Sequence, residues 1–441
     1  MSPYNQPYTD LKSKLIADFR AAEERMNGES KSPLHQLRRE ALNQFDRLGF
    51  PTLKHEEWKY SNVSSLIKEV FEFNAPVSLT ADDLAPLSIA KLEGNVLYFV
   101  NGQYQPELSQ IVSPADQLSI LTFPEAVQQM PEVVDQYFAK YADFHDNAFT
   151  ALNTAFASDG VVIHVPANKV VEAPTILRFI SDSRQINIAS QPRNLFVVGK
   201  NADVKVAELF RTLGDQASFT NIVTEIVLDE DARMEYYKVQ NESDMAYHIG
   251  TTQVHQKDRS HFYSATVTLD GGFIRNNLNI ALDGQHCEAF MYGLYFPNGR
   301  QHIDNHTLAD HRQPNSYSNE LYKGILEDKA TGVFNGKIFV RQDAQKTNAY
   351  QSCKNVVLSN EASMNTKPQL EIYADDVKCS HGTTTGKLNE EALFYMRSRG
   401  IPRDEAKTLL MYAFAEDVIQ QIKIDALREQ LERRIQAKLA R

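Results

Sequence analysis

The chain has 441 residues and a net charge of −11, with 42% hydrophobic and 23% charged side chains. This balance is typical of a globular protein with one large core or two to three domains, and it excludes a disordered chain. No apolar run approaches the roughly 18 residues needed to span a membrane. An acidic surface repels nucleic acid and anionic lipid. We therefore expect neither a nucleic acid nor a membrane as partner.

The cysteines and the first residues bear on the cellular compartment. The chain has three cysteines, Cys287, Cys353 and Cys379, far apart in the sequence. Such an odd and sparse set fits a reducing environment and not a disulfide framework. The opening segment, 1–6, lacks the basic residues followed by an apolar stretch that begin a secretory signal. The expected location is the cytoplasm.

Residues 1–94 are expected to form a helical N-terminal region. One helix is predicted at about 9–26. A second begins after Ser32, which is followed by proline, a pair typical of a helix start. Apolar residues then recur at helical spacing up to Gly49, which favours a helix end. Trp58, the only tryptophan, is interpreted as a packing anchor between elements.

Residues 95–387 are expected to form strands throughout. The clearest strand-like segments are 96–100, 194–198, 222–228, 264–269 and 277–282. They are short, β-branched or alternating, and polar turns separate them. No helix of useful length is predicted between them, which argues against a fold of alternating strands and helices. Short strands with turns at quasi-regular spacing favour a β-solenoid, with a double-sheet sandwich as the alternative.

Residues 388–441 return to a helical pattern. Asn389 is expected to cap a first helix, which Gly400 ends, and Pro402 precedes a second one. The predicted apolar stripe consists of Leu409, Leu410, Ala413, Phe414, Val418 and Ile422, followed by Ile424, Leu427, Leu431, Ile435 and Leu439. Such a stripe indicates packing on the chain's own domain, with docking of a partner as the competing interpretation.

The densest group of titratable side chains comprises His302, Asp304, His306, Asp310 and His311. The first three would share one face of a strand, because side chains alternate along it. Three interpretations are open: a hydrogen-bonded polar ladder, a metal site or a catalytic centre. The spacing does not match the helical zinc motif, in which two histidines lie four apart with a glutamate beside the first.

Cys379 and His381 form a second candidate site. In an extended segment the thiol and the imidazole would point to the same side. This ligand pair suits iron, zinc or copper(I), and the neighbouring Lys378 is expected to favour the thiolate. Two ligands do not complete a tetrahedral site, so another segment or a partner must do so. A protease-like nucleophile and base, or a purely structural role, are the alternatives.

A longer stretch of sequence, from Gln301 to Gly400, points to a known family. It contains Asp304-Asn-His-Thr-Leu308, Leu321-Tyr-Lys-Gly-Ile325, Gly332-Val-Phe-Asn-Gly-Lys-Ile-Phe-Val-Arg341, Asp375-Asp-Val-Lys-Cys-Ser-His-Gly382 and Ala392-Leu-Phe-Tyr-Met-Arg-Ser-Arg-Gly400. Together these segments resemble the SufB/SufD family of iron–sulfur cluster assembly proteins, over about a quarter of the chain. Within the family the chain is similar to the D-type subunits. B-type subunits carry a cysteine cluster toward the N-terminal side, and no cysteine precedes Cys287 here. Thr383 departs from the family pattern, where alanine is expected.

The resemblance implies a mainly β protein: a right-handed parallel β-helix with helical ends. It also implies a non-catalytic scaffold and not an enzyme. A SufB-type subunit would pair along the β-helix, and a SufC-type ATPase would dock on 388–441. His381, with Cys379, would face the B-type partner and help hold a nascent iron–sulfur cluster. The isolated chain would hold no resident cofactor; a flavin in the complex and a homodimer of the isolated chain are further options that the resemblance leaves open.

Two other functions compete with the scaffold. One is a β-helix enzyme acting on polysaccharides through carboxylates and His302, His306 and His311. The other is an autonomous zinc protein that uses the same histidines. Secreted lyases normally carry a signal peptide and glycan clefts favour several exposed aromatic residues, whereas this chain has no such signal and one tryptophan. We therefore expect the scaffold.

Overall fold

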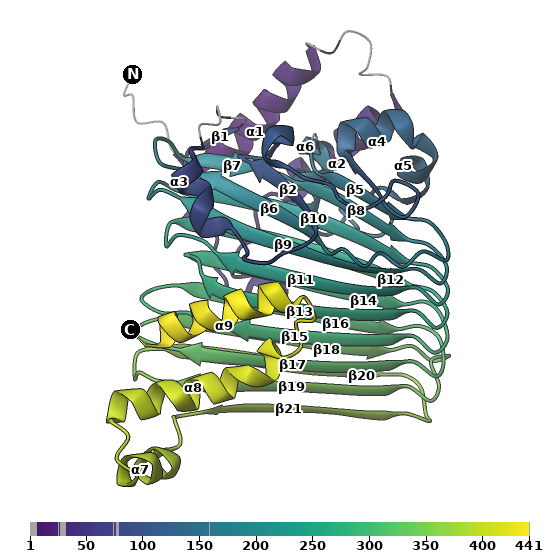
Figure 1. Cartoon of the computed structure of the whole chain (residues 1–441). Helices are drawn as coiled ribbons and strands as arrows, with labels where there is room; N and C mark the ends of the chain where they lie inside the picture. The colour runs from purple at the N-terminus through teal and green to yellow at the C-terminus, as the bar shows by residue number, and fades with distance from the viewer. Residues whose placement is uncertain are drawn as a thin grey trace.

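Two stacked sheets of parallel strands form the body of the protein, seen in Figure 1 as a column of long strands. The computed structural model describes residues 7–24, 26, 32–73, 75, 79–157 and 159–440. The segment 1–6, in which we expected no targeting signal, lies outside the described residues. Along most of the chain, successive strands join opposite sheets, so that each rung contributes one strand to each sheet. The predicted β-solenoid is confirmed.

Each of the five predicted segments lies within a strand, and three of these strands, β10, β13 and β14, begin three or four residues earlier than predicted. The first sheet contains β1 (Glu72–Phe73), β4 (Ser119–Thr122), β5 (Val161–Val165), β7 (Ile188–Ser190), β8 (Arg193–Val198), β10 (Ser218–Leu228), β12 (Ala246–Gln256), β14 (Phe273–Leu282), β16 (His302–His311), β18 (Thr331–Val340) and β20 (Ser363–Ile372). The second contains β2 (Asn95–Val100), β3 (Gln103–Tyr104), β6 (Thr175–Asp182), β9 (Asp203–Leu213), β11 (Arg233–Asn241), β13 (His261–Asp270), β15 (Glu288–Tyr295), β17 (Tyr317–Leu326), β19 (Asn348–Val357) and β21 (Lys378–Gly386).

One corner of the solenoid repeats the same backbone conformation in successive rungs. Residues with positive φ recur there, namely Asn168, Asn201, Asp231, Arg259, His286, Asn315 and Lys346. The N–H of each donates to a carbonyl of the following rung, as from Asn201 to Glu230 at 2.9 Å. The residue after most of these is small and buried, and at one rung it is Cys287. Cys287 therefore fills the inside of a corner.

The helices lie at the two ends of the chain and in one insert. They are α1 (Pro7–Glu24), α2 (Pro33–Leu48), α3 (Ala81–Leu84), α4 (Phe123–Gln129), α5 (Pro131–Tyr137), α6 (Ala148–Phe156), α7 (Glu390–Ser398), α8 (Arg403–Ile419) and α9 (Asp425–Leu439), with single 3₁₀ turns at Glu56–Trp58, Leu66–Lys68, Ala85–Leu87 and Pro106–Leu108. None of these described helices is both long and apolar enough to cross a bilayer.

The second N-terminal helix, α2, begins and ends where the sequence predicts, and α1 is shifted by two residues from the predicted 9–26. Ser32 caps α2 by accepting a hydrogen bond from the backbone of His35 at 3.2 Å, and Gly49 ends it with φ of 65°. The ring of Trp58 lies between the guanidinium of Arg275, 4.3 Å from its centroid, and the ring of Phe149. The interpretation of the tryptophan as a packing anchor is therefore confirmed.

The expectation of strands throughout 95–387 is wrong at α4, α5 and α6, which interrupt the sheets between β4 and β5. The start of α4 carries a local signal: Thr122 and Glu125 cap it reciprocally. The helices of this insert cover the first sheet, because the outward side chains of Val162, Leu195 and Val197 are apolar and the helices bury them. The division of the chain at 94 and 387 stays a prediction.

A buried ion pair ties this insert to the first sheet. Arg193 on β8 and Glu225 on β10 are both fully buried, with 2.5 Å between Nη2 and Oε2. The Glu225 carboxylate also accepts backbone hydrogen bonds from Ala139, Tyr141 and Ala142, at 2.8–3.0 Å, in the loop after α5. The loop position therefore depends on this one carboxylate.

The C-terminal helices α8 and α9 lie on the outer face of the second sheet (Figure 1). Asn389 caps α7 as predicted, and Leu427, Leu431 and Ile435 of α9 are buried. The stripe predicted for α8 is partly wrong: the buried residues are Ala406, Met411, Ala415, Val418 and Ile419, whereas Leu409 and Ala413 are exposed. Apolar residues occur on both sides of α8, so their spacing alone could not identify the packed side.

Candidate functional site

His302, Asp304 and His306 lie on the outer face of β16, under the segment 55–61. Ser61 Oγ lies 2.8 Å from His302 Nε2 and also donates to the Asp304 carboxylate. Asp304 accepts from Arg275 Nη1 at 2.7 Å, and His306 Nε2 lies 3.1 Å from Asp304 Oδ1. These side chains therefore bond one another in a ladder that holds the N-terminal segment on the sheet.

The electrostatics of this ladder favour a structural role. Burial alone would raise the pKa of Asp304, but the charges of Arg275 and His306 outweigh it and hold the pKa well below its ordinary value. Burial lowers the pKa of His302. His311 points into the solenoid, 2.8 Å from Ser318 Oγ, where burial lowers its pKa to about 4. Among the residues that the structure describes, no group of three or more His, Cys, Asp or Glu is arranged to hold a metal ion.

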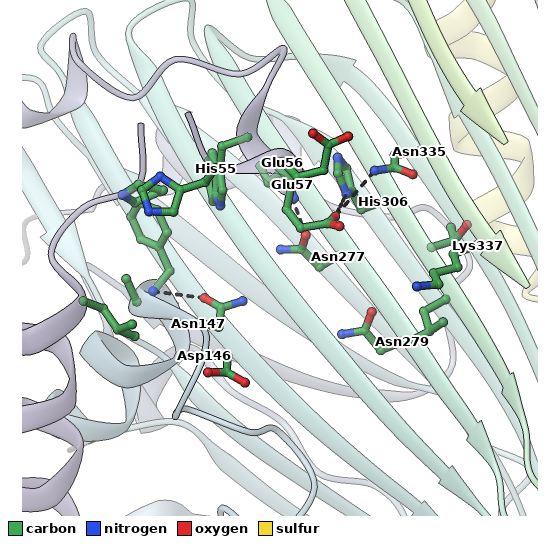
Figure 2. Close-up of a pocket in the computed structure, with 18 of the residues that line it drawn as sticks. His55, Glu56, Glu57, Asp146, Asn147, Asn277, Asn279, His306, Asn335 and Lys337 are labelled. Carbon is green, nitrogen blue, oxygen red and sulfur yellow. Dashed lines mark hydrogen bonds and ion pairs between the residues drawn. The ribbon is translucent and has the colours of Figure 1, made fainter. Parts of the chain in front are cut away.

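A pocket of about 540 Å³ opens beside the ladder (Figure 2). It lies between the segment 48–58, the start of α6 and the outer face of the first sheet. In Figure 2 Glu57 points at His306 and Asn335, from which its Oε2 is 3.3 and 3.5 Å away. Lys337 in its wall is paired with Glu371 at 2.6 Å. The sequence could not indicate this pocket, because its walls come from three distant segments.

The pair Cys379 and His381 lies on β21, the last strand of the second sheet. The register places Ala349 opposite Cys379 and Gln351 opposite His381. Ala349 and Gln351 are buried inside the solenoid, so the thiol and the imidazole both lie on the inward side, as expected from the alternation. Cys379 is half-buried and His381 is exposed.

This pair is placed at the open end of the solenoid. Within the described chain, β21 is hydrogen-bonded only to β19 and β20 only to β18, so both sheets end in an unpaired edge. Figure 1 shows β21 as the last strand of the column. An unpaired edge presents backbone donors and acceptors to another chain. The two candidate ligands therefore lie at an edge that another chain can cover.

The expectation that Lys378 favours the thiolate of Cys379 is wrong. Burial raises the pKa of the Cys379 thiol, and the backbone hydrogen bond of Ala349 opposes that shift without reversing it. Lys378 is adjacent to Cys379 in a strand, so its side chain points to the opposite face. Burial therefore makes the thiolate of Cys379 harder to form than that of a free cysteine.

The three cysteines should react with iodoacetamide in an order set by exposure and pKa. Cys379 is half-buried, whereas Cys287 and Cys353 are fully buried, and burial raises the pKa of Cys353 to about 12. At about pH 8.5, near the ordinary thiol pKa, the folded chain should be alkylated at Cys379 alone, slowly, and at all three after unfolding. Peptide mass spectrometry measures this order. Alkylation of Cys353 as fast as that of Cys379 would contradict the placement of both.

Comparison with known proteins assigns the chain to a family. The profile described as "SUF system FeS cluster assembly, SufBD core domain" matches residues 179–414, and that of the "SufBD protein N-terminal region" matches 9–177. An iron–sulfur cluster assembly SufBD family protein of Synechocystis is 33% identical over 92% of this chain and 91% of its own length.

Two relatives named SufD extend this likeness. The iron–sulfur cluster assembly protein SufD of Escherichia coli is 30% identical, over 93% of this chain and 94% of its own. SufD of Bacillus subtilis is 26% identical, over 90% of this chain and 92% of its own length. Together the two profiles cover the N-terminal helices, the solenoid and α7, and the three relatives match 90–93% of this chain. The chain therefore belongs to the SufBD family of iron–sulfur cluster assembly proteins.

Proposed function

We propose that this chain is a non-catalytic scaffold subunit for iron–sulfur cluster assembly, which contributes His381 and Cys379 to a nascent cluster. The observation that most supports this proposal is an incomplete ligand pair on the unpaired terminal strand of a SufBD family chain. Thiolate and imidazole are ligands that suit iron. The cluster is bound only temporarily and then passed to another protein. Two ligands from this chain and others from a partner can therefore hold it.

The proposed partner at this edge is a SufB-type subunit. The free edges of β20 and β21 can be extended by strands of another chain, since backbone pairing requires no particular side chains. A second copy of this chain is the competing occupant when the B-type subunit is absent. In either case the covering chain encloses His381 and supplies the missing ligands.

The proposed dock for a SufC-type ATPase is the surface of α7 and the start of α8. Phe394, Tyr395 and Leu409 are 73%, 59% and 44% exposed, which is unusual for large apolar side chains on packed helices. Exposed aromatic residues of this kind are frequent anchors in protein interfaces. ATP hydrolysis would then be supplied by the docked subunit.

Co-purification tests this proposal directly. The chain is co-expressed with SufB-type and SufC-type subunits of the same source and purified through a tag on this chain. Both subunits should co-elute, and iron and acid-labile sulfide should be found in the complex. Fluorescence of the supernatant after denaturation of the same sample shows whether a flavin is bound. Elution of this chain alone would contradict the scaffold function.

Replacing Phe394 with aspartate and Tyr395 with serine should remove the ATPase from the complex while the B-type subunit still co-elutes. Each lost aromatic anchor is expected to weaken docking by about 2 kcal/mol or more, roughly thirtyfold. Tyr60→Ser is a control, since Tyr60 is 40% exposed on the N-terminal segment. Undiminished recovery of the ATPase would show that the dock lies elsewhere. Removal of 388–441 is not equivalent, because α8 and α9 bury the outer face of the second sheet.

A further inference from the structure

Three side chains form a column along the inward face of the last rungs of the second sheet. The register pairs Glu320 on β17 with Gln351 on β19, and Gln351 with His381 on β21. Neighbours in register on adjacent strands have Cβ atoms about 5 Å apart, within reach of one another's side chains. The column runs from the interior of the solenoid to its open end.

The two inner members of this column are buried, and each makes only some of the hydrogen bonds that its side chain can make. Gln351 and Glu320 are 4% and 2% exposed. Gln351 Nε2 donates to Glu320 Oε2 at 2.9 Å. Gln351 Oε1 is buried and has no hydrogen-bond partner among the described residues. Leaving a buried acceptor without a partner is unfavourable, so a donor for this oxygen is expected.

The opposite sheet leaves room for the amide. A Cβ atom on Gly336 of β18 would lie 2.3 Å from Gln351 Nε2, closer than any real contact. Any larger residue at this position would push the amide away from Glu320. The absence of a side chain at Gly336 therefore leaves the space that the Gln351 amide occupies.

The next rung carries the donor. His381 is the residue in register with Gln351, and in this structure its imidazole is exposed and has no hydrogen-bond partner among the described residues. We propose that Gln351 is a positioning residue for His381: its amide oxygen accepts an N–H of the imidazole, and Glu320 holds the amide in the orientation that presents this oxygen.

Such a bond would act on the ligand and not on the cluster itself. An imidazole that donates from one ring nitrogen has its lone pair on the other, and the hydrogen bond selects which nitrogen binds metal. This inference rests on the proposed function, since it concerns the orientation of a proposed cluster ligand. It can nevertheless be tested without a cluster or a partner.

The test is the ratio of the two neutral tautomers of His381 in the full-length chain. It is measured by NMR of ¹⁵N-histidine-labelled protein, with the signals identified from their loss in His381→Ala. The measurement is made at about pH 8.5, where Glu320, whose pKa burial raises to about 7, is ionised. One hydrogen bond should shift the ratio about two- to tenfold from that of free imidazole.

Variants separate this role from general packing. Gln351→Leu and Glu320→Leu should return the ratio to that of free imidazole, whereas Glu320→Gln, which still accepts from the amide, should keep it. Gln240→Leu is the matched control, because Gln240 is equally buried but lies on β11, several rungs away.

Two outcomes would overturn the inference. One is a wild-type ratio equal to that of free imidazole, which needs no variant and would mean that a buried water satisfies Gln351. The other is a ratio that Gln351→Leu leaves unchanged. Neither outcome bears on whether His381 binds a cluster, so a failure here is distinct from a failure of the scaffold function.

Discussion

Replacing Glu225 with alanine is expected to destabilise the folded chain by about 3–5 kcal/mol. Arg193 would keep its hydrogen bonds to Asn153 and Thr154, at 3.3 and 3.0 Å, but its charge would stay buried without a carboxylate. The three backbone N–H groups of the loop after α5 would also lose their acceptor. Urea unfolding followed by circular dichroism measures the loss.

The control for this prediction is an exposed pair of the same chemistry. Glu230 bonds Lys200 at 2.6 Å and also contacts Arg259, on the surface of a corner. Solvent screens such pairs, so Glu230→Ala should leave the unfolding midpoint close to that of the wild type. If Glu225→Ala unfolds at the same urea concentration as Glu230→Ala, the buried pair does not hold the insert on the sheet.

Replacing His381 with alanine should lower the cluster content of the co-purified complex at least about tenfold. Loss of a residue that merely orients a ligand costs metal sites ten- to a hundredfold in affinity, and loss of the ligand itself should cost no less. The imidazole is exposed and lies at the open end, so the unfolding midpoint should not change. Iron and sulfide analysis of the complex, normalised to this chain, measures the effect.

Thr383→Ala is the matched control for His381→Ala. Thr383 is the next inward residue of β21, is also exposed and bears no metal-binding group of comparable strength. Its replacement should leave both cluster content and subunit composition as in the wild type. A His381→Ala complex with wild-type cluster content would remove the imidazole from the mechanism, and equal losses in both variants would indicate damage to the edge strand.

The fold was largely predictable because its main features repeat over short distances. Strands such as β10 and β14 are predicted from their β-branched or alternating residues and from the turns that end them. The caps of α2 and α7 depend on one or two residues each. The insert of α4 to α6 was missed although Thr122 and Glu125 signal its start, because each helix is only seven to nine residues long.

The candidate site, like the fold, was predictable from the sequence only in part. The sequence by itself determined that Cys379 and His381 share a face, since this follows from the period of a strand. Only the tertiary structure decided that they lie at an unpaired end above Gln351, and that burial raises the pKa of the thiol. Those facts depend on which strand lies beside which, and pairing between rungs is set by the length and shape of the intervening corners. No local pattern of residues encodes that pairing.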